Sequence, residues 1–442
     1  MPVAVVVLLP AVVGDVPERS VRARVPPGVE PGPRVLLIAP PNSYRIAPFI
    51  NAARQLGADV LIASQGEHSL VSEIASGLQI DLRKPEAALQ SILAVAAQRA
   101  FAAVLGTDDS TVELASAVAK GLGLRHNPPQ AARRTRRKDL ARADLQRAGV
   151  PVPWFQCIDL TRAIPAQCSA VPFPCVVKPL ALSASRGVIR CDTCAQLHAA
   201  CERIGVIIAS EEDAEERTQV LVEQFIPGRE VALEGLLHDG ELQVLALFDK
   251  PDPLDGPYFE ETYYITPSRL DARMQTRVRD TVARACAAYG LHTGPVHAEL
   301  RIHDEGAWIL EVAARTVGGH CARLLRFGIG HGVEELVIAQ ALGRELKITA
   351  ADGAAGVLMI PIPAAGVLRR VEGLLTAQRV PYIEDIEISV REGYELVPLP
   401  EGASYLGFMF ARAPTAELAE QALRAAHACL NIVIAPVWKL TN

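Results

Sequence analysis

The chain has 442 residues, half of them hydrophobic, and a formal net charge of −6 at pH 7. That length allows about two to four domains with buried cores, and the acidic balance argues against nucleic acid as a main partner. Nine cysteines stand without the regular spacing of a disulfide scaffold, which indicates a reducing, cytoplasmic location.

The N-terminal segment, residues 1–33, is rich in Pro, Val and Arg. Its apolar start, about a dozen residues long, lacks the basic residues of a signal peptide and is too short to cross a bilayer. We therefore expect a poorly ordered leader. No other segment reaches membrane-spanning length, so we expect no membrane partner.

Strand and helix patterns alternate in residues 34–129. "RVLLIAP", "DVLIAS" and "FAAVLGT" predict strands, and "APFINAARQLGA" and "AALQSILAVAAQRA" predict the helices between them. This alternation predicts an open, parallel α/β sheet. The stretch "STVE", Ser110 to Glu113, predicts a capping box at the start of the next helix.

Strand and helix patterns continue through residues 130–349. The strand "FPCVVKPL" carries Lys178 and leads into the small-residue loop "LSASRGVIR". Further along, "REVALEGLLHDG" and "ELQVLALFD" predict an antiparallel meander, and a long helix over residues 271–289 precedes a hairpin. The last segment, 350–442, mixes short strands with one amphipathic helix and predicts a small α+β appendage.

The stretch "HAELRIHDEGAWILEVAART", residues 297–316, predicts that hairpin. Its two halves alternate with a period of two, and "DEG" supplies turn residues. A turn centred on Glu305 leaves one face apolar and sets two carboxylates opposite each other on the other face. The predicted cross-strand pairs are Glu299–Glu311, Leu300–Leu310 and Ile302–Trp308.

Two carboxylates that face each other across a hairpin destabilise it unless something offsets their repulsion. At about 5 Å and an effective dielectric constant of about 20, that repulsion is roughly 3 kcal/mol. The pair suits Mg²⁺, which takes one or two carboxylates and completes its shell with water and phosphate oxygens. The alternative is a solvated face on which Arg301 and Arg315 neutralise the pair.

Two further features indicate a phosphate ligand and a nucleotide base. Lys178 lies next to a small-residue loop whose amides could hold phosphate, although a lysine that snorkels from a strand end is an equal alternative. Glu223 ends a strand and is followed by a Pro-Gly turn and Glu230. The free backbone there could pair with an adenine edge, and the alternative is a plain hairpin with solvated acids.

The order of these parts resembles the ATP-grasp superfamily, and the resemblance extends from Arg34 to the C-terminus. Within it, the chain is most similar to the carboxylate–amine ligase branch that includes the L-amino-acid (dipeptide) ligases. The resemblance implies an N-terminal open parallel-sheet domain (34–129), two nucleotide-gripping lobes (130–222 and 223–349) and a small C-terminal α+β subdomain (350–442).

The resemblance also implies roles for individual residues. Phosphates would be bound by Lys138 and Lys178 and covered by a loop with Ser183, Ser185 and Gly187. The adenine hinge would be Glu223 with the backbone of Gln224, Phe225 and Ile226, and Glu230 would hold the ribose. Glu299 and Glu311 would bind Mg²⁺, with Mn²⁺ as an alternative. The catalytic residues would be Arg315 and Lys250, and the substrate pocket would include His297, Glu261, Gly318, Gly319 and His320.

Two positions depart from the superfamily pattern. Ala313 stands where many members have an Asn, so the metal would rest on two protein carboxylates with more water and phosphate. The loop "LALSASRGV" has one glycine where many members have several.

The implied reaction is carboxylate activation. A small carboxylate, such as an amino acid, attacks the γ-phosphate of ATP and gives an acyl phosphate and ADP, and an amine then displaces phosphate. The expected partners are a small-molecule carboxylate and amine, with a homodimer suggested by analogy. Two alternatives remain open: an enzyme that activates bicarbonate, like biotin carboxylase or carbamoyl-phosphate synthetase, and a regulator that binds ATP without turnover.

Overall fold

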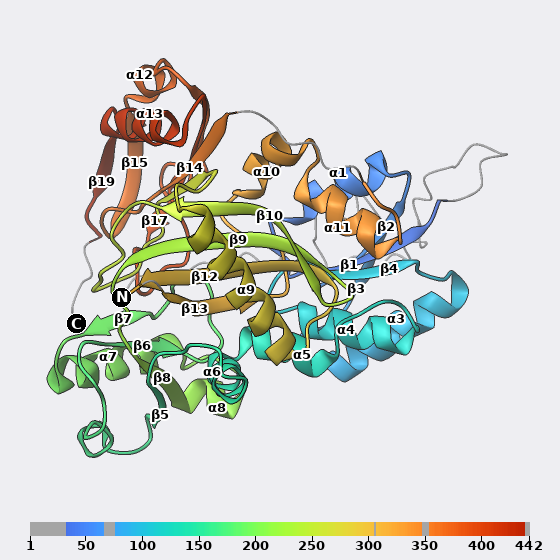
Figure 1. The fold of residues 1–442 in the computed structure, drawn as a ribbon, viewed down its shortest axis with the longest axis horizontal. Coiled ribbons are helices and arrows are strands. Elements are labelled where there is room, and N and C mark those ends of the chain that lie inside the picture. The colour runs from blue at the N-terminus through green and yellow to red at the C-terminus, as the bar shows by residue number, and fades with distance from the viewer. Residues whose placement is uncertain (1–31, 66–75, 305, 347–352, 438–442) are drawn as a thin grey trace, which may run out of the picture. The chain divides into compact units, whose positions relative to one another are not determined.

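A computed structural model describes residues 32–65, 76–304, 306–346 and 353–437, and Figure 1 shows their four sheets. The predicted leader, 1–33, lies almost wholly outside the described residues. In the ranges that the structure describes, no helix is both long and apolar enough to cross a membrane.

The first sheet is parallel, as the alternating pattern predicted. Its strand order is β3-β2-β1-β4, with β1 (Arg34–Ile38) fully buried from Val35 onward. The other elements are α1 (Ile46–Gln55), β2 (Asp59–Ser64), β3 (Ser76–Gln79), α3 (Pro85–Gln98), β4 (Ala103–Gly106) and α4 (Val112–Gly121). The predicted capping box is wrong: Thr111 precedes α4, and its hydroxyl bonds Asp108 rather than a backbone N–H of the first turn.

The second sheet is antiparallel and follows two short helices. Its strand order is β5-β8-β6-β7, and β6 carries Lys178. The elements of this part are α5 (Pro129–Arg136), α6 (Lys138–Arg147), β5 (Phe155–Asp159), the 3-10 helix η1 (Ile164–Gln167), β6 (Cys175–Pro179), β7 (Ile189–Cys191), α7 (Cys194–Ile207), α8 (Ala214–Thr218) and β8 (Gln219–Gln224).

The third sheet has eight strands in the order β13-β12-β9-β10-β11-β14-β18-β16. The predicted C-terminal subdomain contributes three strands, β14, β16 and β18, to this sheet. These strands therefore do not form a separate sheet within that subdomain. The first part comprises β9 (Arg229–His238), β10 (Glu241–Lys250), β11 (Tyr263–Thr266), α9 (Ala272–Tyr289), β12 (Gly294–His303), β13 (Gly306–Ala313), α10 (Ala322–Ile329) and α11 (Val333–Ala341). Helix α9 packs against this sheet, where it contacts β13 and β10 (Figure 1).

The C-terminal elements also form a three-stranded sheet of order β17-β15-β19. They are β14 (Ala354–Ile360), β15 (Gly366–Glu372), α12 (Leu374–Gln378), β16 (Ile383–Ile388), β17 (Glu395–Leu396), β18 (Gly407–Ala413), α13 (Ala416–Ala428) and β19 (Asn431–Ala435). One buried cluster joins Phe49 of α1, Phe248 of β10, Val337 of α11 and Phe410 of β18. This shared core holds elements from distant parts of the sequence in fixed positions around one cavity.

The hairpin β12–β13 confirms one predicted pair and corrects two. Glu299 lies opposite Glu311, as predicted, but a β-bulge follows Glu299. The observed pairs are therefore Leu300–Ile309 and Ile302–Ala307, in place of Leu300–Leu310 and Ile302–Trp308. A bulge sets two residues of one strand opposite one residue of its partner. The predicted register, which assumed a turn centred on Glu305, is therefore wrong between Glu299 and the turn. The extra residue, Leu310, lines the cavity beside the carboxylates.

Candidate active site

A cavity of about 500 Å³ collects most of the residues that the sequence singled out. Two of those residues do not line it. Gly187 donates its N–H to the Pro400 carbonyl at 2.9 Å, and Lys250 lies buried beneath the cavity wall. The predicted residues that do line it are Lys138, Lys178, Ser183, Ser185, Glu223, Gln224, Phe225, Ile226, Glu230, Glu261, His297, Glu299, Glu311, Arg315, Gly318, Gly319 and His320.

A buried cluster of charged side chains lies at the end of the cavity where the adenine base was predicted to bind. Lys178 Nζ lies 2.5 Å from Glu223 Oε2, and Glu223 also pairs with Arg142, which the sequence did not single out. Burial opposes charge on Glu223, but the two cations outweigh it and lower the pKa of Glu223 to about 2. The carboxylate of Glu223 is thus already paired, and only its neighbouring backbone is left to meet a base.

We expect Glu223→Gln to destabilise the fold by about 3–5 kcal/mol, since it leaves two cations buried without their partner. Urea denaturation without nucleotide measures this change. Glu202 is 72% exposed, and Glu202→Gln is the control, with an expected change within about 0.5 kcal/mol. A loss below about 1 kcal/mol for Glu223→Gln would show that the cluster is not a structural element.

In the described ranges, the backbone after β8 leaves one N–H group free to meet a ligand in the cavity. Gln224 and Phe225 donate their N–H groups to the carbonyls of Trp154 and Pro174, at 2.8 and 2.9 Å. The carbonyl of Ile226 accepts from Arg301 Nη1 at 3.0 Å. Within the described part of the chain, the N–H of Ile226 has no acceptor, and this residue lines the cavity.

The small-residue loop after β6 adopts an unusual backbone. Ala184 and Ser185 have φ of 56° and 53°, in the left-handed region that few side chains adopt. Arg186 Nε donates to the Glu401 carbonyl at 3.1 Å, so the loop is tied to a segment more than two hundred residues away. At the base of the loop, Lys138 Nζ donates to the Leu182 carbonyl at 2.6 Å.

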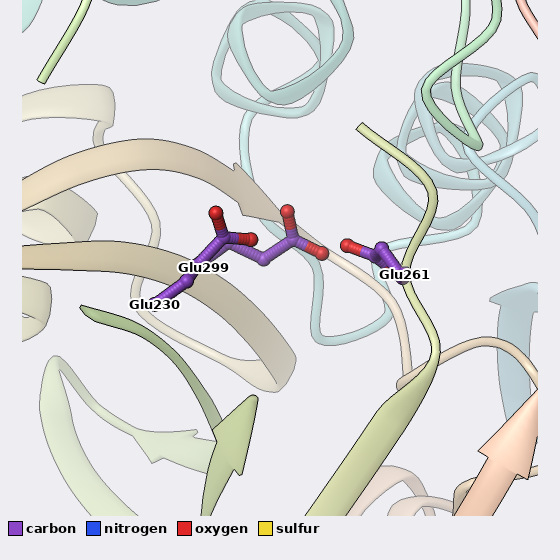
Figure 2. Close-up of side chains that lie close together, drawn as sticks. All are labelled: Glu230, Glu261 and Glu299. Carbon is purple, nitrogen blue, oxygen red and sulfur yellow. The ribbon is translucent and has the colours of Figure 1, made fainter. Parts of the chain in front are cut away.

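Three carboxylates meet around Lys250. Figure 2 shows Glu230, Glu261 and Glu299 turned toward one another, with one oxygen of each within 4.8 Å of the others. Lys250 Nζ lies 2.8, 2.5 and 3.4 Å from these three carboxylates in turn. Although burial disfavours charge on Lys250, the three acids raise its pKa. The ammonium therefore serves as the cation of this cluster.

The carboxylates of Glu299 and Glu311, the predicted metal ligands, fit a metal ion better than the three acids around Lys250 do. Both oxygens of Glu230 are engaged, by Lys250 and by Arg301 Nε at 3.2 Å. Both oxygens of Glu261 are engaged too, by Lys250 and by the Tyr264 hydroxyl at 2.9 Å. All four oxygens of these two carboxylates are therefore already bound by protein groups.

Glu299 and Glu311 are less committed. The contacts of Glu299 with Tyr264, His297 and Lys250, at 3.4–3.5 Å, all reach Oε1. Among the described residues, the carboxylate of Glu311 has one ion-pair partner within 4 Å, Lys138 Nζ at 3.6 Å, and it accepts no hydrogen bond. Both side chains line the cavity on adjacent strands, so this oxygen pair fits the preference of Mg²⁺.

Glu234 is a residue that the sequence reading missed. It is fully buried on β9, and its Oε1 accepts the Val317 N–H at 3.1 Å. His297 Nδ1 lies 3.3 Å from Glu234 Oε2, within ion-pair range but outside hydrogen-bond geometry, and His297 Nε2 lies 3.4 Å from Glu299. Glu234 therefore connects the loop after β13, through His297, with Glu299, a predicted metal ligand.

Arg315 is held by an acid from the first domain. Its Nε donates to Asp109 Oδ1 at 2.9 Å, across 206 residues of sequence. Burial favours the neutral acid, but Arg315 and Arg45 outweigh it and lower the pKa of Asp109. Arg45 Nη1 in turn donates to the carbonyls of Thr316 and Val317, at 2.6 and 3.0 Å. The only sequence signal for Asp109 was its place just after a predicted strand.

Gly319 occupies a position that has no room for a side chain. Its φ is +59°, and an added Cβ would lie 2.3 Å from Met359 Sδ. We expect Gly319→Ala to lower the rate of ADP formation about tenfold, because Met359 and the loop must shift. Gly343 is the matched control, since it has φ +69° and nothing within 4 Å of an added Cβ. Equal effects of the two alanines would contradict a steric role at Gly319.

Comparison with known proteins gives two family matches. Residues 171–323 match the ATP-grasp domain, and residues 358–435 match the L-amino acid ligase C-terminal domain 2. Alanine–anticapsin ligase of Bacillus subtilis is 25% identical over 275 residues, 58% of this chain and 58% of that protein. D-alanine–D-alanine ligase of Hydrogenovibrio crunogenus is 30% identical over 170 residues, 37% of this chain and 50% of the relative. The chain thus matches between half and three fifths of the length of these two relatives.

Among solved structures, an L-amino acid ligase from Bacillus licheniformis superposes with a TM-score of 0.77 at 24% identity, covering 92% of this chain and 100% of that one. This similarity confirms the predicted ATP-grasp fold, with a parallel N-terminal sheet followed by antiparallel ones. Both of the sequence relatives above are named as ligases of alanine.

Proposed function

We propose that this chain, which matches the ATP-grasp domain and the L-amino acid ligase C-terminal domain 2, activates an amino acid as its acyl phosphate and joins it to an amine. The observation that carries the proposal is the cavity itself. It brings two lysines, the facing carboxylates Glu299 and Glu311, and Arg315 to one space of about 500 Å³. The domain boundaries and the individual residue roles are part of this proposal.

ATP would lie with its base at the Ile226 N–H and its phosphates toward Lys138 and Lys178. The left-handed loop at Ala184 and Ser185 would cover those phosphates with its backbone amides. Glu299 and Glu311 would hold Mg²⁺, or Mn²⁺, which when bound would neutralise charge on the phosphates. Both oxygens of Glu230 accept hydrogen bonds, from Lys250 and Arg301. A contact of Glu230 with the ribose would therefore require one of these oxygens to accept a second hydrogen bond.

In the first step, a carboxylate oxygen of the amino acid attacks the γ-phosphorus. An O–P bond forms, the bond to the bridging oxygen breaks, and ADP leaves. In the second step, the amine attacks the acyl carbon, phosphate leaves with the former carboxylate oxygen, and the nitrogen loses a proton. Arg315, held by Asp109, would stabilise the negative charge that develops on the transferring group. The protein's contribution is positioning and charge neutralisation.

Nucleotide analysis by mass spectrometry tests this function. The purified protein is incubated with Mg·ATP and pooled amino acids, with controls that contain no acid or bicarbonate alone. We expect ADP and a new amide mass only when amino acids are present. ADP formed with bicarbonate alone would favour the bicarbonate-activating alternative, and ATP binding without turnover on any acid would favour a regulator.

A further inference from the structure

An apolar wall stands at one end of the cavity, and the proposed ATP contacts do not use it. Its members, here called the aromatic wall, come from four separate segments: Tyr44 before α1, His320 after β13, Met359 on β14, and Tyr405 just before β18 with Phe408 on that strand. All five side chains line the cavity.

The rings of the aromatic wall contact one another in sequence. The ring centroids of Tyr44 and His320 are 4.9 Å apart, and those of His320 and Phe408 are 4.6 Å apart in an edge-on arrangement. Tyr405 follows at 6.2 Å from Phe408. These distances are typical of packed aromatic clusters, which hold their shape and offer both ring faces and ring edges to a ligand.

The aromatic wall carries no net charge. Burial lowers the pKa of the His320 imidazole, so the ring is neutral near pH 7. Burial also raises the pKa of Tyr405 well above its ordinary value, so the phenol stays protonated. Such a surface favours an apolar ligand group over a charged one, because a buried charge without a partner is costly.

The position of the aromatic wall relates it to the amino-acid substrate. The Tyr44 hydroxyl accepts the Gly319 N–H at 3.0 Å, four residues after Arg315. On its other side, Tyr405 lies close enough to Glu261 and Lys250 for their charges to act on its phenol. The aromatic wall thus contacts the loop that follows Arg315 through Tyr44, and it approaches the cluster around Lys250 through Tyr405.

We propose that the aromatic wall binds the side chain of one amino-acid substrate and selects a large apolar one, either aromatic or of the size of Leu and Met. This inference rests on the proposed ligase function and adds the substrate class. It also gives the C-terminal subdomain a role in specificity, because Met359, Tyr405 and Phe408 belong to it. None of these three residues was predicted as a site residue from the sequence.

The test measures kcat/KM for ADP formation with one varied amino acid, either large and apolar or small or charged. A second amino acid is present at a fixed excess. The wild-type protein should prefer Phe, Tyr, Trp, Leu or Met over Ala, Ser, Asp and Lys by at least about tenfold, which is the discrimination that one apolar pocket provides. Mass spectrometry of the product shows which position of the amide the large residue occupies.

Two variants then connect the preference to the aromatic wall. Tyr44 is 46% exposed, so Tyr44→Ala should fold normally and reduce kcat/KM for large apolar amino acids about 10–100-fold more than kcat/KM for Ala. Tyr44→Phe should retain the preference, since the ring remains. Phe408→Ala should act in the same direction, after a denaturation curve has confirmed its fold. Tyr394, 60% exposed and away from the cavity, is the control, and Tyr394→Ala should change nothing.

The outcomes are distinguishable. ADP formation that is equally efficient with small or charged amino acids would overturn this inference and leave the ligase function intact. The same holds if Tyr44→Ala and Phe408→Ala lower the rates for all amino acids equally. No ADP with any pair of amino acids would overturn the proposed function and, with it, the inference.

Discussion

Replacing Glu311 by glutamine is expected to lower Mg-dependent ADP formation by about 100-fold or more. Loss of a residue that only supports a metal ligand already costs about 10–100-fold, and Glu311 would be a ligand itself. Stability should not fall, because the side chain is 27% exposed and faces another carboxylate, Glu299, directly across the hairpin. Steady-state kinetics at several Mg²⁺ concentrations, with a melting curve for each protein, measure both effects.

The control for this prediction is Glu241→Gln, which changes an exposed acid on β10 of the same sheet. It should retain the wild-type rate. If Glu311→Gln also retains it, Glu311 is not a metal ligand. If instead Glu261→Gln abolishes the Mg²⁺ dependence and Glu311→Gln does not, the cluster around Lys250 would be the metal site.

Arg315→Ala is expected to lower kcat about 10²–10³-fold, which is the effect of removing one preorganised donor to developing negative charge. The KM for ATP should change little, because the proposed ATP contacts lie on other residues. Arg315→Lys keeps the charge but loses the planar group that Asp109 orients, so it should recover only part of the rate.

Asp109→Asn tests whether the contact from the first domain matters. It keeps the size of the side chain and removes its charge, and we expect a drop in kcat of about tenfold, as for a residue that supports another. Arg315→Ala and the double variant should then have similar rates, since Asp109 acts through Arg315. Additive losses in the double variant would show that Asp109 contributes independently of Arg315.

The sequence predicted best those features that depend on neighbours along the chain. Glu299 and Glu311 were paired correctly because a hairpin brings them together over a few residues. The bulge after Glu299 was missed, since alternation alone does not reveal an extra residue. The parallel first sheet was predicted from the alternation of buried strands and helices, which reflects local propensity and burial.

Features that join distant segments were missed for a physical reason. Asp109 and Arg315 meet across 206 residues, and the sequence around Asp109 is that of an ordinary loop. Glu234 reads as one residue of a plain strand, and only the fold shows that it is fully buried beside His297. Phe408 likewise reads as core, and its place in the cavity follows from β18 extending the third sheet.

The central claim is that a carboxylate is activated as an acyl phosphate, and oxygen transfer tests it most directly. An amino acid that supports turnover is prepared with ¹⁸O in both carboxylate oxygens, and the released phosphate is analysed by mass spectrometry. We predict ADP together with phosphate that carries one ¹⁸O atom, because one carboxylate oxygen leaves with the phosphorus. Unlabelled phosphate, or AMP with pyrophosphate, would contradict the claim.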